Sequence, residues 1–471
     1  MRFALCKFLI LALVLVSVTG AMAAELTLDD CITLALKNRA SIISARNAEQ
    51  LAAVSQRAAL GAFLPNVAAS YRYTHNEITN IKPDENVPTA YDTTISTVVV
   101  GGDTAKVVRT RVTDYTTIPS PDIKSTSKIW DISGGISFTL PDAWFSYAAA
   151  RLDHESARLD VIASEQDLIL AVKQAFYLYL ATVQDVSVQE EAVKRSDEQL
   201  KLIQSKFELG SAAKSDVLKQ KVQYGNDKLA LLQAQNAVIT ANASLAYTIG
   251  LDPMQDHQFS TQYSVRQFEG TLAEAVQFGL THKPSLLSTE KSIGAANQSL
   301  MSAKWGYLPK ASPFVSYGYE RITGPNQSYN PLLATSTEGT ESRNTLTYGL
   351  SFNWNIFDGF AREQRVKAAK VAKNNLQASL ADSRNLVASQ IKSAYLNIDQ
   401  LKQRQQVARD NVDAASEDLK ITQEKYNLGA ATILDLLDAQ VSMKQAQVAQ
   451  ISADFDLNVA ISNLENAMGK M

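Results

Sequence analysis

The sequence predicts a mainly α-helical chain with a transmembrane β-barrel, internally duplicated, with four strands and long coiled-coil helices in each protomer. Three observations predict this fold. One plan of elements occurs twice, stretches without proline permit very long helices, and the segments between them alternate apolar and polar residues.

Residues 1–23 are predicted to be a secretory signal peptide. Arg2 and Lys7 precede the apolar run 8–16, and Ala21-Met22-Ala23 supplies the small residues of a cleavage site. We expect the mature chain to begin near Ala24. The following sequence has no run of the roughly 18 apolar residues that a transmembrane helix requires.

Composition excludes several classes of protein. The net charge is −3, or −5 without the two basic residues of 1–23, and no basic patch or motif indicates nucleic acid. Cys31 is the single cysteine of the expected mature chain, so no internal disulfide can form, and its context does not fit lipid attachment. The four histidines are scattered, and no nucleophile–base pattern or phosphate loop occurs. We therefore expect a non-enzyme with no cofactor, no metal site and no nucleic-acid partner.

The chain is an internal duplication. Residues from 27 onward align without a gap on those from 271, and residues 175–250 align on 394–469. In the second alignment, positions 200, 201, 204, 206, 209, 210, 216 and 218 recur as Leu419, Lys420, Gln423, Lys425, Leu428, Gly429, Asp435 and Leu437. Two copies of one supersecondary plan therefore make up the molecule.

Each copy follows the order helix, strand, loop, strand, long helix, glycine turn, helix. After the signal peptide, we expect a helical segment, barrel strands and a helical hairpin at 24–65, 66–142 and 143–250. A linker at 251–270 leads to the second copy of these three parts at 271–309, 310–360 and 361–471.

Four strands are predicted near 67–73, 132–140, 315–319 and 346–356, each alternating apolar and polar residues. A soluble sheet with one wet face would alternate in the same way. Expected lengths of about 9–11 residues favour a membrane barrel. Aromatic residues at the strand ends also favour it, as interfacial girdles do: Trp130, Trp144, Phe145, Trp305, Tyr307, Trp354, Phe357 and Phe360. The long loop 76–128 contains Gly101-Gly102-Asp103, which suggests a hairpin inside it.

Four strands cannot close a barrel, because the smallest membrane barrels need about eight. The protomer is therefore expected to oligomerise. Two copies would give a filled barrel and three would leave a passage, and the strand count alone does not choose between them.

The helical part contains two very long helices, expected at 143–209 and 361–428, each spanning roughly 100 Å. Val186, Val193, Leu200 and Phe207 recur every seven residues, so coiled-coil packing is expected. Each long helix reverses at a glycine, Gly210 or Gly429. Returning helices at 215–249 and 434–468, stacked end to end on helices at 27–64 and 271–308, would match the long ones. The assembly would be a cylinder wall, and the alternative is a solid bundle.

These features together resemble the TolC family of outer-membrane efflux proteins. The resemblance rests on the duplication, the Leu-Pro junctions at 64–65 and 308–309, and the Leu-Gly turns followed six residues later by Asp216 and Asp435. It implies a homotrimer with a twelve-stranded barrel in outer-membrane lipid, continued by an α-helical periplasmic tunnel. It also implies docking onto a periplasmic adaptor and an inner-membrane pump.

Asp435 and Asp438 are the first candidate functional residues. They share one face of a helix just past the Gly429 turn, and threefold symmetry would arrange six carboxylates that attract cations and raise one another's pKa. The family resemblance implies that they form the periplasmic constriction ring. The alternative is a pair of exposed acids that the helix dipole favours.

Two further groups follow from the resemblance. Asp216, Ser215 and Tyr426 match a tip latch whose arginine position is occupied here by Ala431, and packing in a heptad seam is an alternative role for Tyr426. The turns themselves would contact the adaptor, although helix capping also explains their glycines: Leu209, Gly210, Ser211, Leu428, Gly429 and Ala430. The expected function is the exit channel of a tripartite efflux or type I secretion system. The alternative is a periplasmic coiled-coil scaffold without a pore.

Overall fold

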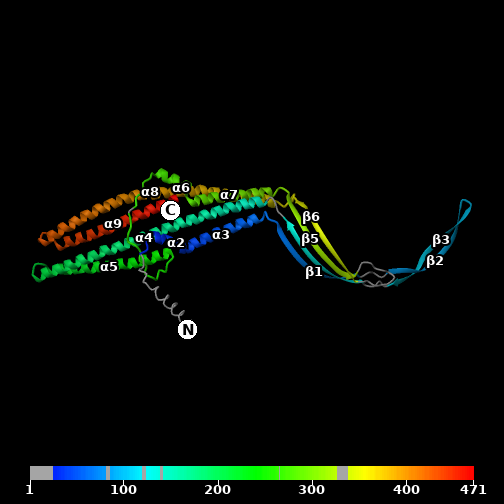
Figure 1. Ribbon diagram of the computed structural model, residues 1–471, viewed down its shortest axis with the longest axis horizontal. Helices are drawn as coiled ribbons and strands as arrows, with labels where there is room; N and C mark the ends of the chain where they lie inside the picture. The colour runs from blue at the N-terminus through cyan, green and yellow to red at the C-terminus, as the bar shows by residue number, and fades with distance from the viewer. Residues whose placement is uncertain (1–24, 81–84, 119–122, 138–141, 265, 326–337) are drawn as a thin grey trace, which may run out of the picture. The chain divides into compact units, whose positions relative to one another are not determined.

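The computed structural model describes residues 25–80, 85–118, 123–137, 142–264, 266–325 and 338–471 (Figure 1). The expected signal peptide at 1–23 lies outside these ranges. The chain divides into two compact units. The strand unit comprises the described residues of Leu60–Trp144 and Gly306–Asp358, and the helical unit comprises the other described residues.

Four strands of the strand unit form one antiparallel sheet in the order β1-β4-β5-β6. They are β1 (Asn66–Asn80), β4 (Ile123–Ser137), β5 (Lys310–Pro325) and β6 (Glu338–Asn353). The predicted length of about 9–11 residues was wrong, because the strands have 15 or 16. Prediction followed the apolar alternation, whereas backbone pairing continues through the polar ends, where Asn76 faces Ser127 and Asn80 faces Ile123.

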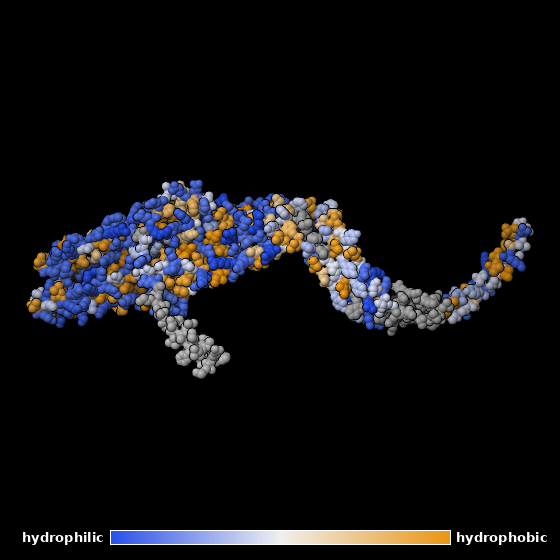
Figure 2. Space-filling model, viewed as in Figure 1, coloured by the Kyte–Doolittle hydropathy of each residue, from blue (hydrophilic) through white to orange (hydrophobic). Residues whose placement is uncertain are grey.

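The register confirms that the alternating residues share a face. Val67 pairs with Ile136, Ile136 with Val315, and Val315 with Tyr348, so one apolar row crosses all four strands. The adjacent row carries small or polar side chains, since Ala68 aligns through Gly135 and Ser316 with Thr347. Apolar side chains of this sheet are exposed in the protomer: Val67, Tyr71, Val315, Tyr317, Leu346, Tyr348, Leu350 and Phe352. Figure 2 shows such hydrophobic residues on the surface of the strand unit.

The segment predicted as a long loop with a hairpin contains β2 (Glu85–Val100) and β3 (Asp103–Ile118), which pair with each other. The hairpin is confirmed at its predicted turn. Gly101 and Gly102 both have positive φ, of 69° and 94°, a combination that a type I′ hairpin turn requires and glycine adopts without strain. The described strands therefore number six rather than four.

The helical unit is built on two helices of 67 residues, α4 (Asp142–Glu208) and α8 (Ala361–Asn427). Both lie within a residue of their predicted bounds. They reverse into α5 (Lys214–Ile249) and α9 (Ile433–Met468), each of 36 residues. Absence of proline from the interior of all four helices permits these lengths.

The two shorter helical segments differ from prediction, since each is broken. The first consists of α2 (Leu28–Asn38) and α3 (Ala40–Gly61), the second of α6 (Leu272–His282) and α7 (Pro284–Trp305). In the second copy, Lys283 precedes a proline and adopts an extended backbone with ψ 117°. Arg39 takes the same conformation, with ψ 126°, without any proline. Helices α3 and α7 also end three residues before the Leu-Pro junctions rather than at them.

The breaks also correct the expected splice. Arg39 Nη1 donates to the carbonyl of Tyr247 near the end of α5, at 2.9 Å, so α5 ends against the α2–α3 break. Lys283 Nζ likewise donates to the carbonyl of Asn466 near the end of α9, at 2.7 Å. Helices α2 and α6 therefore lie beside the ends of α5 and α9, and only α3 or α7 can extend the line of a returning helix. The expected end-to-end stack, which used all of 27–64 or 271–308, was too long.

Two apolar clusters form the core of the helical unit. One joins α2, α3, α4 and α5 through Ala35, Ile42, Phe176 and Leu245, and the other joins α6, α7, α8 and α9. The predicted seam of α4 is only partly enclosed, since Val186 and Val193 are half-buried and Phe207 is 42% exposed. The positions three residues further along, Gln189, Ser196 and Ile203, are buried.

Candidate functional site

Both helical hairpins reverse through the same glycine turn. Gly210 and Gly429 adopt left-handed backbone conformations, with φ 76° and 78°. Ser211 N–H donates to Lys206 O at 2.8 Å and Gly210 N–H to Phe207 O at 2.9 Å, which is the Schellman arrangement that closes a helix C-terminus. Residues 425–430 repeat these bonds. Helix capping therefore accounts for the glycine at both turns.

The turns also expose two leucines. Leu209 is 84% and Leu428 is 85% exposed, whereas Ser211 is held by its hydroxyl to Lys206 O. In Figure 2 hydrophobic residues mark the ends of both hairpins. Capping needs the glycine but not an exposed leucine before it, so the leucines are available for contact with a partner.

Asp435 has a structural function that sequence reasoning missed. The Thr432 N–H and hydroxyl donate to Asp435 Oδ2 at 2.8 and 2.7 Å, and Asp435 N–H donates back to the hydroxyl at 3.3 Å. This capping box starts α9. The hydrogen bonds hold the pKa of Asp435 below its ordinary value in the single chain. The Thr-x-x-Asp spacing was the available signal. Asp438 is also exposed, one turn further along α9.

The duplicate of Asp435 is Asp216, which lies in a different setting. Ala213 occupies the N-cap of α5 and offers no side-chain hydrogen bond, so Asp216 has no capping box. Ser215 Oγ donates to Asp216 Oδ1 at 3.4 Å. Burial, and secondly the charge of Asp216, raise the pKa of Tyr426 on the other hairpin.

Tyr426 links the hairpins through a residue that sequence reasoning did not single out. Lys206 Nζ of α4 lies 4.8 Å from the centroid of the Tyr426 ring, within the range of a cation–π contact. Tyr426 also packs, with Leu419, against a small apolar cluster of Ile203, Ile433 and Leu436. The packing role considered for Tyr426 is therefore present.

A groove of about 700 Å³ is lined by five of the eleven residues that the sequence predicts at the tip. Its lining includes Lys206, Asp216, Tyr426 and Ala431, with the turn residues Ser211, Leu428 and Gly429. The other six predicted residues are not part of the lining: Leu209, Gly210, Ser215, Ala430, Asp435 and Asp438. Position 431 thus faces the groove at which the latch is expected, and it carries only a methyl group.

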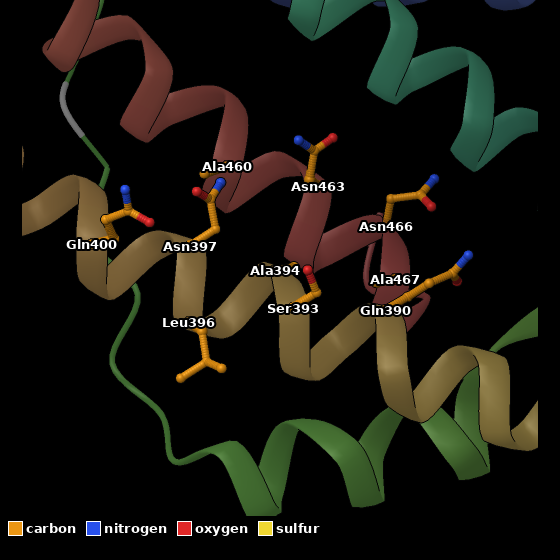
Figure 3. A pocket seen from close by; sticks show the side chains of 10 residues that line it. All are labelled: Gln390, Ser393, Ala394, Leu396, Asn397, Gln400, Ala460, Asn463, Asn466 and Ala467. Atoms are coloured by element: carbon orange, nitrogen blue, oxygen red, sulfur yellow. The ribbon is translucent and has the colours of Figure 1, made fainter.

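A second groove, of about 670 Å³, lies between α8 and α9 (Figure 3). Amide and hydroxyl groups dominate it, from Gln390, Ser393, Asn397, Gln400 and Asn463, and none of its ten lining residues titrates. In the part of the chain that the structure describes, no cluster of three or more metal-ligating side chains is found. No described helix is apolar enough over a sufficient length to cross a membrane.

Comparison with known proteins gives one family. Residues 122–251 and 276–470 match the family described as outer membrane efflux protein. The outer membrane efflux protein BepC of Brucella suis is 22% identical over 479 residues, covering 100% of this chain and 91% of BepC. The outer membrane protein TolC of Vibrio cholerae is 24% identical, covering 72% of this chain and 77% of TolC. The Campylobacter jejuni CmeC outer membrane channel has a similar fold, with a TM-score of 0.73 and 16% identity over 94% of this chain and 85% of CmeC.

Proposed function

This chain belongs to the outer membrane efflux protein family, and from that premise we propose that three copies form the exit channel of a tripartite export system. The channel passes substrates received from an inner-membrane pump across the periplasm and the outer membrane. Its fold is that of the family's outer-membrane channels, and a scaffold without a pore does not fit that membership.

The observation that carries the proposal is a sheet that is apolar on one face and open at both edges. Among the described strands, β1 and β6 each pair on one side only. Unpaired backbone groups in a hydrocarbon layer each cost several kcal/mol, so a sheet in a membrane must close. Three copies of four strands close as a twelve-stranded barrel with the row of Val67, Val315 and Tyr348 toward lipid.

An unpartnered seam on α5 supports the same assembly. Leu218, Val222, Leu229, Leu232 and Ile239 follow heptad spacing and are 54–64% exposed in the protomer. A neighbouring copy would cover this stripe. Twelve helices, four from each protomer, would then enclose a passage.

The passage carries no chemistry in this proposal, and the chain is not an enzyme. Asp435 and Asp438 would form a ring of six carboxylates at the periplasmic end, selecting cations and narrowing the path. The groove formed around Asp216, Tyr426 and Ala431 would be where the closed tip is held. Lys206 stacked on Tyr426 supplies a cationic contact between hairpins there, in a chain that has alanine where the family has arginine.

The partners in this proposal are a periplasmic adaptor and an inner-membrane pump. The exposed leucines of the two turns, Leu209 and Leu428, are the surface offered to the adaptor, together with Gly210, Ser211, Gly429 and Ala430. Residues 1–23 direct secretion and are removed. The same channel would serve drug efflux or type I secretion, depending on the pump.

Two measurements test the proposal. In membrane fractionation, the protein should remain with the outer membrane through a salt wash and leave it only in detergent. Purified material should then crosslink as trimers and conduct ions in a planar bilayer. Release by salt, or a predominantly monomeric folded species, would contradict it.

A further inference from the structure

The buried seam of α5 changes character along the helix. Every seventh residue from Gln220 is buried: Gln220, Asp227, Ala234 and Ala241. The half nearest the Gly210 turn is therefore polar and the far half apolar. The seam of α4 facing it contains buried Gln189, Ser196 and Gln199 near the same end. Such side chains are seldom fully buried without a specific partner.

At the centre of this polar seam lies an ion pair between the two hairpins. Lys444 Nζ of α9 is 2.9 Å from Asp227 Oδ1 of α5, and their side chains are 21% and 5% exposed. Gln223 Nε2 donates to both Asp227 oxygens, at 3.1 and 3.2 Å. Asp227 therefore accepts hydrogen bonds from its own helix and from the opposite hairpin. It lies roughly 20 Å along α5 from the turn.

The groups around the pair are polar and incompletely hydrogen-bonded. Gln189 Oε1, Gln199 Nε2, Gln220 Oε1 and Gln447 Oε1 are buried and have no partner among the described residues. Gln220 does anchor to α4, through Nε2 donating to Ser196 O at 3.1 Å. Gln447 lies one turn from Lys444 on α9. When the helices separate, water can solvate these amide groups, so their exposure costs little. Exposing packed leucines to water would instead destabilise the separated state.

The polar seam is bounded by apolar packing on both sides. Toward the turns lies the small cluster of Ile203, Ile433 and Leu436, and away from them lies the large cluster around Phe176 and Phe455. Separation of the hairpins is therefore easiest between these clusters, where the Asp227–Lys444 pair is the direct charged contact from α5 to α9 that the structure shows.

We propose that the Asp227–Lys444 ion pair is the clamp that holds the two hairpins of one protomer together in the closed channel, and that opening separates it. The inference rests on the proposed function, since it concerns how that channel opens. The polar seam would then hold the channel closed at a second place, in addition to the groove at the tip.

A clamp of this type should respond to substitution in a characteristic way. Removing one partner leaves the other charge buried and unpaired, which favours the separated state in which water solvates it. Replacing both partners with hydrophobic residues of similar volume removes the desolvation cost and holds the helices together. A single substitution should therefore open the channel, and the hydrophobic double substitution should close it more firmly than the native pair.

The first test measures open probability of purified trimers in planar bilayers. Asp227→Asn and Lys444→Gln should each raise it about tenfold or more, equivalent to about 1.4 kcal/mol. Asp227→Leu combined with Lys444→Met should lower it below that of the wild type. Asp456→Asn is the matched control, because it breaks an ion pair with Arg404 that is 50% exposed on both sides and lies within one hairpin.

The second test does not depend on conduction. Spin labels at Lys221→Cys of α5 and Ser442→Cys of α9, both exposed and outside the apolar stripe of α5, report the separation of the hairpins in detergent. Cys31 is fully buried and should not react. The distance should lengthen in Asp227→Asn and stay short in the hydrophobic double variant.

Unchanged distance and open probability in both single variants would overturn the clamp. So would a double variant as open as the single ones, or a loss of thermal stability without any change in opening. A wild-type trimer that never conducts would contradict the proposed channel instead, and the label distances would still decide whether the pair holds the hairpins together.

Discussion

Replacing Leu209 and Leu428 with serine is expected to weaken adaptor binding while leaving the protein folded. These side chains are 84% and 85% exposed, so nearly their whole apolar surface can be buried by a partner. Burying a leucine fully stabilises a complex by about 1.5–3 kcal/mol. Each leucine should therefore contribute about 1.3–2.5 kcal/mol, and each single substitution should raise the Kd about tenfold or more.

The folded protein should tolerate these changes. The turns are held by backbone hydrogen bonds and by the left-handed glycines, and the leucine side chains are not part of them. Exposed substitutions away from such features usually change the free energy of unfolding by less than about 0.5 kcal/mol. Thermal stability of the trimer should be unchanged.

The assay is binding of detergent-solubilised trimers to the purified periplasmic adaptor of the same bacterium, immobilised on a sensor. Met254→Ser is the matched control, because Met254 is 90% exposed but lies in the linker 251–270. It should bind like the wild type. Intact trimers of Leu209→Ser and Leu428→Ser with an unchanged Kd would refute the assignment of the turns as the adaptor surface.

Three other results are expected. Chemical crosslinking in detergent should trap trimers, since the sheet has two open edges, and a folded monomer would contradict this. Asp435→Asn with Asp438→Asn should reduce cation selectivity and block by multivalent cations in a bilayer, whereas Arg72→Gln in the barrel should not. The midpoint temperature of thermal dissociation of the trimer should be lower in Gly469→Ala than in Gly429→Ala. Both glycines have left-handed backbones, in which alanine costs roughly 1–2 kcal/mol. In addition, a Cβ at 469 would lie 2.9 Å from a neighbouring backbone atom, whereas one at 429 would meet nothing within 4 Å. Equal dissociation temperatures of the two variants would show that the backbone near 469 shifts to accommodate the Cβ at no cost.

The charge prediction needs one further control, because the structure gives Asp435 a second role. Asparagine at 435 weakens the capping box with Thr432 as well as removing a charge. Asp438→Asn alone removes charge without touching the box. If the ring exists, this single variant should already reduce selectivity, and Thr432→Ala should leave it unchanged.

The sequence by itself determined the order of the elements and their duplication. Helix α4 could be placed because a stretch without proline and with a glycine at its end leaves little choice. The strands could be oriented because alternation has a period of two, and the register puts Val67 and Val315 in one row as expected. The break at Lys283 is also predictable from the sequence, because a residue before proline disfavours the helical conformation.

Only the tertiary structure decided the rest, because it depends on contacts between distant segments. Nothing local marks the break at Arg39, which is fixed by its bond to Tyr247 at the end of α5. The duplicated Asp216 and Asp435 differ for a local reason instead, since Thr432 provides a capping hydroxyl three residues before Asp435 and Ala213 provides none before Asp216. The seam through Gln220 and Asp227 escaped prediction because a search for heptads follows apolar residues. Burial of Asp227 can be explained only by its ion pair with Lys444, which is 217 positions away in the sequence and is brought beside it by the fold.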